Sequence, residues 1–432
     1  MKQLSRTGRY TFRFHAFSSA LDGAVNGVLS LNDIILRKTL GASDLVLTLF
    51  VTGQSAALLF PASWTDFTRG RYIRSSYIWF GILGRLTLAA LLFVATPVPF
   101  AAVVVFAGFM FNALLPAQNM LFQSNYAAAE RGRAFGFARR LFAGAFLVAA
   151  LGAGYLLEWR SLSWRFYYPA VGVIGLASCL LLRRVKLRRL PGRGAGRLRG
   201  SPTSPDLPSL AWFQATAFRF ATSLVNPFAG SLRTLRADRA FLLYESYFFL
   251  YGMAFMMLQP VIPVFLVDWL GVNYAQAATA RGLILYGMFI LVSPLAGKIC
   301  DRSGPVRLAS GAFALLALFP CALTLAHGIP ALYAAFAIYG IAMAGVDMAW
   351  NMGPIHFAGK RDSTVYMGAH TALVAIRALI GAPLGMIVMR AAGTPRATFV
   401  VAGVLFLSGA IGMRRLAGRK LPLEDQPAEA AP

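Results

Sequence analysis

Charge is scarce in this chain of 432 residues, because only 13% of its residues are Asp, Glu, Lys or Arg. A soluble domain carries roughly 25%. Acidic residues are the rarer kind, with 16 Asp and Glu against 41 Lys and Arg. So few ionic groups cannot cover the surface of a soluble protein of this length. Together with the 58% hydrophobic content, the deficit excludes a soluble fold and indicates a protein embedded in lipid.

The residues needed for metal or phosphate chemistry are equally sparse. The three cysteines, Cys179, Cys300 and Cys321, form no CxxC pair, which argues against disulfides and a zinc site. The four histidines are scattered, and no GxxxxGK[ST] phosphate-binding loop occurs. We therefore expect no enzyme activity, no ATP-driven step, no cofactor and no metal. The net charge of +25 lies in short loops rather than on one domain face, so we expect no nucleic-acid partner either.

Long apolar runs fill most of the chain, and the mean hydropathy is +0.62. Windows of about 20 apolar residues, broken by charge, Pro or Gly, recur from end to end. They predict an all-α membrane protein with about twelve transmembrane helices. The predicted spans are 15–36, 43–62, 73–95, 99–122, 134–157, 165–183, 241–267, 279–297, 306–326, 330–353, 364–389 and 397–413.

The basic residues predict the orientation of these spans. The two ends of the chain and every second loop hold 32 Lys and Arg residues, whereas the other side holds seven. Loops rich in Lys and Arg stay in the cytoplasm. We therefore predict that both termini are cytoplasmic and that the protein spans the cytoplasmic (inner) membrane several times.

The longest gap between spans, residues 184–240, divides the chain into two halves. It opens with "RRVKLRRLPGRGAGRLRG" and is rich in Gly, Pro and Ser, as a flexible linker would be. The later "LAWFQATAFRFATSLVNPF" is amphipathic, and we expect an interfacial helix on the anionic inner leaflet of the bilayer. The predicted parts are an N-terminal six-helix bundle (1–183), this linker, a C-terminal six-helix bundle (241–413) and a cytoplasmic tail (414–432). We expect a monomer.

The two halves resemble each other. "PASWTDFTRGR" follows span two and "PLAGKICDRSGPVR" follows span eight, which places Asp66 and Asp301 235 residues apart. "PAQNM" recurs loosely as "MAWNM", which pairs Asn119 with Asn351 at an offset of 232. Nearly equal offsets indicate two six-helix repeats of the same direction, an arrangement found among transporters.

With these features the chain resembles the major facilitator superfamily. That family carries a Gly-x3-Asp-Arg/Lys-x-Gly-x-x-Arg/Lys loop between spans two and three, often repeated between spans eight and nine. The second copy matches here at Gly297, Asp301, Arg302, Gly304 and Arg307. The first copy is reduced to Asp66, Arg69, Gly70 and Arg71.

Two interpretations of this loop stay open. In the first, the carboxylate of Asp301 latches the cytoplasmic ends by bonding to a helix N-terminus and to the adjacent Arg. In the second, the basic residues only follow the positive-inside rule around a tight turn.

Polar side chains inside the spans are the candidates for binding substrate or a coupling ion. Such groups are costly in hydrocarbon, and they usually face a cavity or a partner. Several share one helical face, such as Asp22, Asn26 and Asp33 in span one, and the resemblance implies that spans 1, 4, 7 and 10 line a central cavity. The candidates are Asp22, Asn26, Gln54, Asn112, Asn119, Gln259, Asp347, Asn351, His370 and Arg377.

Three candidates admit two roles each. Asp347 and Arg377 lie at depths that would let consecutive spans pair them, either as a substrate anchor or proton-linked pair, or as a static pair. Asp22 is a candidate carrier of a coupling proton, with a pair to Arg85 as the alternative. His370 could titrate near neutral pH, with an interfacial position as the alternative.

The sequence therefore favours a secondary active transporter of a small molecule, with protons as a possible coupling ion. A drug or metabolite efflux antiporter is one alternative, because "IGAPLG" in span eleven and Gly136, Gly144 and Gly152 in span five partly match a glycine-rich antiporter motif. Such glycines also allow close helix packing in any membrane bundle. A non-transporting receptor or sensor on the same scaffold is the alternative from another class.

Overall fold

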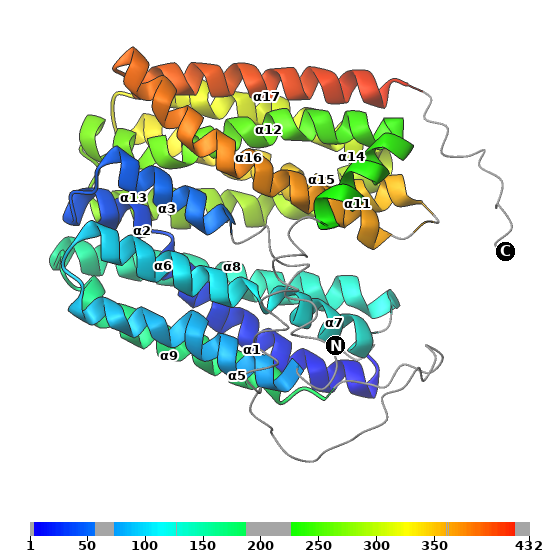
Figure 1. The fold of residues 1–432 in the computed structure, drawn as a ribbon, viewed down its shortest axis with the longest axis horizontal. Coiled ribbons are helices and arrows are strands. Elements are labelled where there is room, and N and C mark those ends of the chain that lie inside the picture. The colour runs from blue at the N-terminus through cyan, green and yellow to red at the C-terminus, as the bar shows by residue number, and fades with distance from the viewer. Residues whose placement is uncertain are drawn as a thin grey trace, which may run out of the picture. The chain divides into compact units, whose positions relative to one another are not determined.

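The computed structural model describes residues 4–56, 73–126, 128–186, 226–359, 361 and 363–419. The described elements are helices, and no strand occurs among these residues. The prediction of an all-α protein is therefore confirmed. Figure 1 shows the long helices, which account for most of the described chain.

The helices of the first half follow the predicted apolar windows, with two changes of helix type. Span one continues from α1 through the short α2 into a π-helix, and span three ends in a 3₁₀ segment. The elements are α1 (Arg6–Leu29), α2 (Asn32–Ile34), a π-helix (Ile35–Thr39), α3 (Asp44–Ala56), α5 (Ile73–Arg85), a 3₁₀-helix (Leu86–Phe93), α6 (Pro97–Asn112), α7 (Leu115–Asn125), α8 (Ala128–Trp159) and α9 (Trp164–Arg183).

The second half contains longer helices and two further π-helices. Its elements are α11 (Asn226–Ala237), α12 (Arg239–Val264), a π-helix (Phe265–Trp269), α13 (Tyr274–Ala278), a π-helix (Thr279–Leu285), α14 (Tyr286–Thr324), α15 (Ile329–Ala358), α16 (Ser363–Ala392) and α17 (Pro395–Ala417). Most of the predicted interfacial segment, up to residue 225, lies outside the described residues.

Eight helices of the described chain are long and apolar enough to cross a membrane. One of them, Tyr274–Thr324, is interrupted at Gly304, whose φ of 79° and ψ of 163° are not helical. This break falls between the predicted spans eight and nine. The protein is thus a multi-pass membrane protein, whereas the count of twelve spans and the cytoplasmic position of both termini stay predictions.

Predicted span four is divided in the structure. The α6 helix ends at Asn112, and α7 begins at Leu115 with Pro116 in its first turn. Proline is accepted there because the first turn needs no intrahelical bond from its nitrogen. The short turn between α6 and α7 therefore follows from the position of Pro116.

The contacts between residues divide the chain into two compact units that are not consecutive stretches. The first unit comprises Met1–Leu29, Phe60–Ala149 and Ser163–Asn226; the second comprises Ser30–Leu59, Ala150–Leu162 and Pro227–Pro432. The border cuts through α8 and follows α1, so that the second unit includes the ends of helices from the first half of the chain. The predicted division at residues 184–240 stays a prediction.

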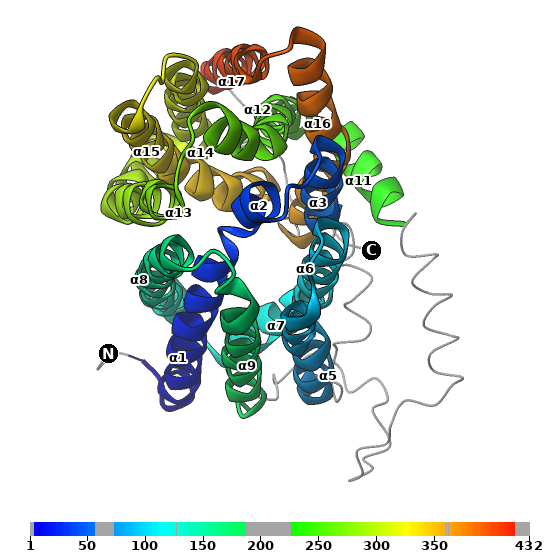
Figure 2. The same ribbon diagram turned by 90° about the vertical axis from the view of Figure 1, so that its left-hand side faces the viewer.

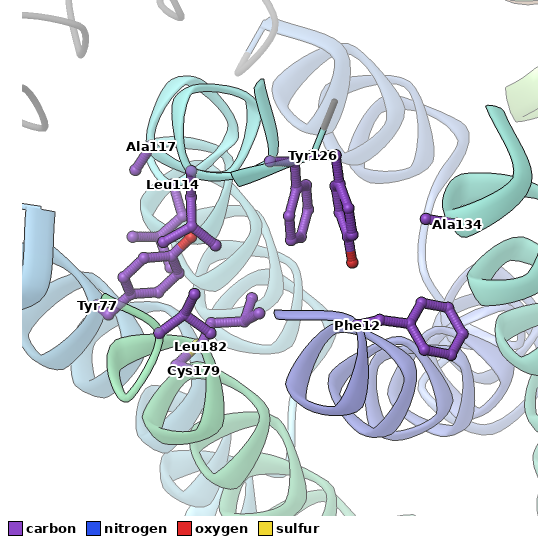
Figure 3. Packing of buried hydrophobic residues seen from close by; sticks show 11 residues of the cluster. Phe12, Tyr77, Leu114, Ala117, Tyr126, Ala134, Cys179 and Leu182 are labelled. Atoms are coloured by element: carbon purple, nitrogen blue, oxygen red, sulfur yellow. The ribbon is translucent and has the colours of Figure 1, made fainter. Parts of the chain in front are cut away.

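In the first unit, α9 packs against α1, α5 and the 3₁₀ segment. A cluster of buried side chains from α1, α5, α7, α8 and α9 fills the space between these helices (Figure 3). Tyr77 and Leu114 are completely buried in it. Small residues such as Ala117 and Ala134 let the helices approach closely.

In the second unit, α12 packs against α16 and α17, and α14 packs against α15 and α17. The short α2 and the helix α3 also lie beside α12, and α3 contacts α16 (Figure 2). The first half of the chain thus contributes an integral part of this unit.

Candidate functional site

Asp22 and Arg85 form an ion pair inside the first unit. Arg85 Nη2 lies 3.1 Å from Asp22 Oδ1, and the arginine side chain is only 3% exposed. Gly175 on α9 leaves room for the Arg85 side chain, because a Cβ at this position would lie 2.6 Å from Arg85 Cδ. The structure therefore forms the pair that the sequence offers as an alternative role for Asp22, and a coupling role stays a prediction.

The other polar residues of span one have separate partners. Asn26 donates from Nδ2 to the backbone oxygen of Asp22 at 2.7 Å. Asp33 accepts from both terminal nitrogens of Arg281, at 2.6 and 2.8 Å. Helical spacing predicts one common face for Asp22, Asn26 and Asp33; in the structure Asp22 and Asn26 belong to the first unit and Asp33 to the second.

Asp347 and Arg377 do not form the predicted ion pair within the described part of the chain. The Asp347 backbone oxygen accepts a hydrogen bond from Nδ2 of Asn351 at 2.7 Å, as Asp22 does from Asn26. Arg377 instead donates from Nη1 to the backbone oxygen of Phe248 at 2.9 Å. The sequence matched the two residues by depth alone, whereas rotation about the helix axis directs the guanidinium of Arg377 toward α12.

Arg377 is held in a space that the sequence of α12 leaves open. Its side chain is buried, and its Cζ lies 5.9 and 5.7 Å from the ring centroids of Phe248 and Tyr251. A Cβ at Gly252 would lie 2.1 Å from Arg377 Nε. Gly252 therefore provides the room for a buried cation between α12 and α16.

Gly252→Ala should displace Arg377 from Phe248 and destabilise the protein by about 1–3 kcal/mol, the usual cost of overpacking a buried site. A thermal melt in detergent, followed by tryptophan fluorescence, should show a lower midpoint. Gly287→Ala in α14 is the matched control, because no atom of the described chain lies within 4 Å of its Cβ position. Equal midpoints for the two variants would contradict the role of Gly252.

The closest pair of buried ionisable groups in the second unit joins Glu245 to His370. Nδ1 of His370 lies 2.9 and 3.0 Å from the two carboxylate oxygens of Glu245. The side chains of His370 and Glu245 are 0% and 2% exposed. His370 is among the residues that the sequence indicates as candidates, whereas Glu245 is not, although a carboxylate within the apolar "FLLYESYFFLYG" is a signal of the same kind.

The remaining candidates are dispersed over the two units. Gln54 is exposed near the end of α3, and Gln259 lies next to the hydroxyl of Tyr339. Asn112 ends α6, and Asn119 lies in α7. Gln54 and Gln259 thus belong to the second unit, and Asn112 and Asn119 belong to the first.

Of the two copies of the loop motif, the structure describes the second. Gly304 breaks α14 with its positive φ, a conformation that glycine adopts without strain. Asp301, Arg302 and Arg307 are exposed, and Asp301 makes no hydrogen bond or ion pair within the part of the chain that the structure describes. The residues of the first copy, Asp66, Arg69, Gly70 and Arg71, lie outside the described residues. The latch stays a prediction.

Two segments of the second unit have the same backbone conformation. We call residues 35–44 the first corner and residues 265–274 the second corner. Each begins with a five-residue π-helix, continues with a Leu-Gly pair and then starts a new helix. Gly41 and Gly271 have φ values of 62° and 61°, and the flanking backbone hydrogen bonds correspond one to one. The offset of 230 residues supports the predicted repeat.

Polar contacts join the two corners to each other. Nε of Arg37 donates to Oδ2 of Asp268 at 2.9 Å, and Nζ of Lys38 donates to the backbone oxygen of Val272 at 2.7 Å. The hydroxyls of Thr39 and Tyr274 are hydrogen-bonded.

Neighbouring charges extend this set of contacts. Asp44 accepts from Nη1 of Arg37 at 3.1 Å and from Nε of Arg390 at 3.0 Å. Glu158, at the end of α8, accepts from the backbone nitrogen of Tyr274 at 2.9 Å. We call the ion pairs of Asp33, Arg37, Asp44, Asp268, Arg281 and Arg390 the corner ion pairs.

No group of three or more His, Cys, Asp or Glu side chains is arranged to hold a metal ion in the described residues. The arrangement instead provides buried charges in helices and a set of partly exposed ion pairs between repeated corners. Groups of these two kinds can exchange their hydrogen-bond and ion-pair partners when the helices that carry them move.

Comparison with known proteins agrees with this picture. A model of the Major Facilitator Superfamily matches residues 15–293 and 246–432. No curated protein matches the sequence. Among solved structures, a variant of the nucleoside transporter NupG shares 11% identity at a TM-score of 0.65, with 94% of this chain and 99% of that chain covered.

Two further structures are similar over the whole chain. A bacterial homolog of the human lysosomal transporter Spinster, in an inward-facing and unoccupied conformation, shares 16% identity at a TM-score of 0.64, covering 98% of this chain and 100% of the other. A structure from the proton-dependent oligopeptide transporters shares 15% identity at 0.66, covering 96% and 99%. At such identities the likeness shows the fold alone.

Proposed function

Because the chain belongs to the Major Facilitator Superfamily, we propose that it moves a small solute across the cytoplasmic (inner) membrane by alternating access, as a secondary active transporter. The protein is a multi-pass membrane transporter and not an enzyme. The observation that carries the proposal of alternating access is the contact between the two corners.

The corner contacts have the chemistry of a barrier that can open. On the predicted orientation the corners lie on the extracytoplasmic side, opposite both termini. Their ion pairs are partly exposed; Arg37 and Asp268, for example, are 21% and 34% exposed. Exposed ion pairs contribute only about 0.2–1 kcal/mol each, because water solvates the separated groups well. A set of such pairs can therefore separate at a cost that suits an equilibrium between two states.

The loop motif, which is predicted to lie on the cytoplasmic side, bears on the same proposal. Alternating access requires that the barrier on one side be open while the other is closed. The Asp301 carboxylate, predicted to latch the cytoplasmic side, makes no hydrogen bond or ion pair with the described residues, while the corner contacts are formed. In the proposed cycle, the corner contacts separate when the predicted latch at Asp301 forms.

The proposal includes partners that follow from the sequence. We take the proton as the coupling ion, a small molecule as the substrate and the anionic inner leaflet as the surface for residues 184–240. The end of this segment is the helix α11, on which Arg233 and Arg236 are exposed. The family does not separate import from export, so a drug or metabolite efflux antiporter remains the alternative within it.

The proposal can be tested without knowledge of the substrate. Gln54→Cys, in a protein whose three native cysteines are replaced by alanine, places a thiol on α3, about 15 Å along the helix from Asp44. A membrane-impermeant maleimide added from outside should label it slowly while the corners are joined. Asp268→Asn combined with Arg281→Gln should raise the labelling rate about tenfold, which corresponds to about 1.4 kcal/mol.

Arg390→Gln is the matched control, because the Arg390 side chain is 64% exposed and its pair with Asp44 should contribute little. Equal labelling rates in the double variant and the parent protein would overturn the barrier. If the labelling rate of the Gln54→Cys reporter also stays the same with every ligand and every ion gradient that is applied, the alternative of a non-transporting receptor is favoured.

A further inference from the structure

Glu245 and His370 lie where α12, α15 and α16 meet, away from the corners. Both side chains are almost completely buried, at 2% and 0% exposure. The imidazole packs edge-on against Phe248 and Trp350, with 5.0 Å between ring centroids in each case. The pair is thus enclosed by aromatic rings from two helices, and water does not solvate its charge.

The hydrogen bonds of the imidazole determine which of its atoms is free. Nδ1 lies within 3.0 Å of both carboxylate oxygens of Glu245. An ionised carboxylate only accepts hydrogen bonds, so beside ionised Glu245 the Nδ1 atom carries the proton and donates it. Nε2 is buried and has no hydrogen-bond partner among the described residues. An unpaired buried polar atom costs roughly 1–3 kcal/mol. In the neutral imidazole, Nε2 therefore carries a lone pair to which no described residue donates a hydrogen bond.

The surrounding charges do not satisfy Glu245 in any other way. Within the described chain, His370 is the only hydrogen-bond donor to this carboxylate. Arg377, whose charge interacts with that of Glu245, donates to the backbone oxygen of Phe248 instead. The other titratable groups around the pair and Arg377 are Tyr244 and Tyr251 on α12, Asp347 on α15 and Cys300 on α14.

We propose that Glu245 and His370 form a site that binds one proton, which enters at Nε2 of His370. The proton converts a neutral imidazole beside a carboxylate into an imidazolium–carboxylate pair. The hydrogen bond at Nδ1 becomes charge-assisted and therefore stronger. No other group has to change its protonation, so the step adds one positive charge to the space between α12 and α16.

Coupling of this proton to solute movement rests on the proposed function; binding of the proton does not. The two residues come from different helices, Glu245 from α12 and His370 from α16. Any movement of α16 along or away from α12 changes their distance, and with it the affinity for the proton. The site would thereby link protonation to the conformation of the second unit.

Trp350 provides a direct measurement of this protonation. A protonated imidazole quenches the fluorescence of an indole in contact with it, and the two rings are in contact here. The difference in emission between the protein and its Trp350→Phe variant should show a one-proton transition as the pH is lowered. The transition should vanish in His370→Gln, change its midpoint in Glu245→Gln and persist in His356→Gln. Absence of a transition in the intact protein, or its survival in His370→Gln, would overturn the site.

A second measurement needs no substitution, in case a variant fails to fold. Deuterium exchange at the C2 position of each histidine, read by mass spectrometry, reports the protonation of each ring separately. The exchange rate at His370 should follow a one-proton curve with the same midpoint as the Trp350 signal. A rate independent of pH would overturn the proposal. Because neither assay involves transport, a negative result here leaves the barrier at the corners standing, and constant labelling of the Gln54→Cys reporter leaves the proton site standing.

Discussion

Exchanging the charges of Asp33 and Arg281 should restore a barrier that either single reversal removes. In the native pair, two hydrogen bonds of 2.6 and 2.8 Å join groups that are 15% and 16% exposed. Asp33→Arg or Arg281→Asp places like charges at this contact. Breaking a fully buried pair costs about 3–5 kcal/mol. Partial exposure reduces this value, and we expect about 2 kcal/mol, or a ~30-fold shift toward the open state.

The labelling rate of the Gln54→Cys reporter from outside measures this shift. Each single reversal should raise the rate ~30-fold, and the double exchange Asp33→Arg with Arg281→Asp should return it to within about threefold of the parent, given the context dependence of such pairs. The backbone oxygen of Ser30, which also accepts from Arg281 at 2.9 Å, loses this bond in the exchanged pair. That loss is why we do not expect complete recovery. A double exchange that labels as fast as the single reversals would show that Asp33 and Arg281 act separately.

The helices could be predicted from the sequence because apolar windows and charge breaks are local features. The two corners could not be predicted, although the sequence contains a Leu-Gly pair at residues 40–41 and another at residues 270–271, 230 residues later. A π-turn followed by a glycine of positive φ depends on what the next helix packs against. That information becomes available when segments distant in sequence meet.

The charged residues of the candidate site were found more easily than their partners. Depth in the membrane and helical spacing selected Asp22, His370 and Arg377, because an ionisable group in an apolar window stands out. Their partners depend on rotation about the helix axis and on small residues in the facing helix. Gly252 opens the space into which Arg377 turns. No pattern within span eleven indicates that space, and the pairing with Asp347 was therefore predicted instead.

For the glycines of span eleven, the sequence leaves two roles open, an antiporter motif and close helix packing, and the structure shows close packing. A Cβ at Gly385 would lie 2.1 Å from the backbone oxygen of Met257, and one at Gly381 would lie 2.8 Å from the Cβ of Met256. The equally spaced glycines of span five, Gly136, Gly144 and Gly152, have no such neighbours among the described residues. In span eleven the pattern therefore serves close packing of α16 on α12, which needs no antiporter motif.

Gly385→Ala should consequently be among the most damaging small substitutions in the protein. The new methyl group would meet a backbone oxygen that cannot turn away, so α16 must move relative to α12. Overpacking of this kind costs about 1–3 kcal/mol, and a rigid backbone neighbour favours the upper end. Alanine improves helix propensity by about 1 kcal/mol in water, so a stabilising effect would be expected if packing did not matter.

The measurement is the thermal midpoint in detergent, with Gly368→Ala as the control on the same helix. Gly368 is exposed, and no described atom lies within 4 Å of its Cβ position. The comparison thus keeps the helix and the added methyl group constant and changes only the neighbour. Gly385→Ala should melt several degrees lower, and equal midpoints would contradict the packing. Because the same interface carries Glu245 and His370, a displaced α16 should also alter the pH dependence of Trp350 emission. If Gly385→Ala lowers the thermal midpoint but leaves the pH dependence of Trp350 emission unchanged, the movement of α16 does not reach Glu245 and His370.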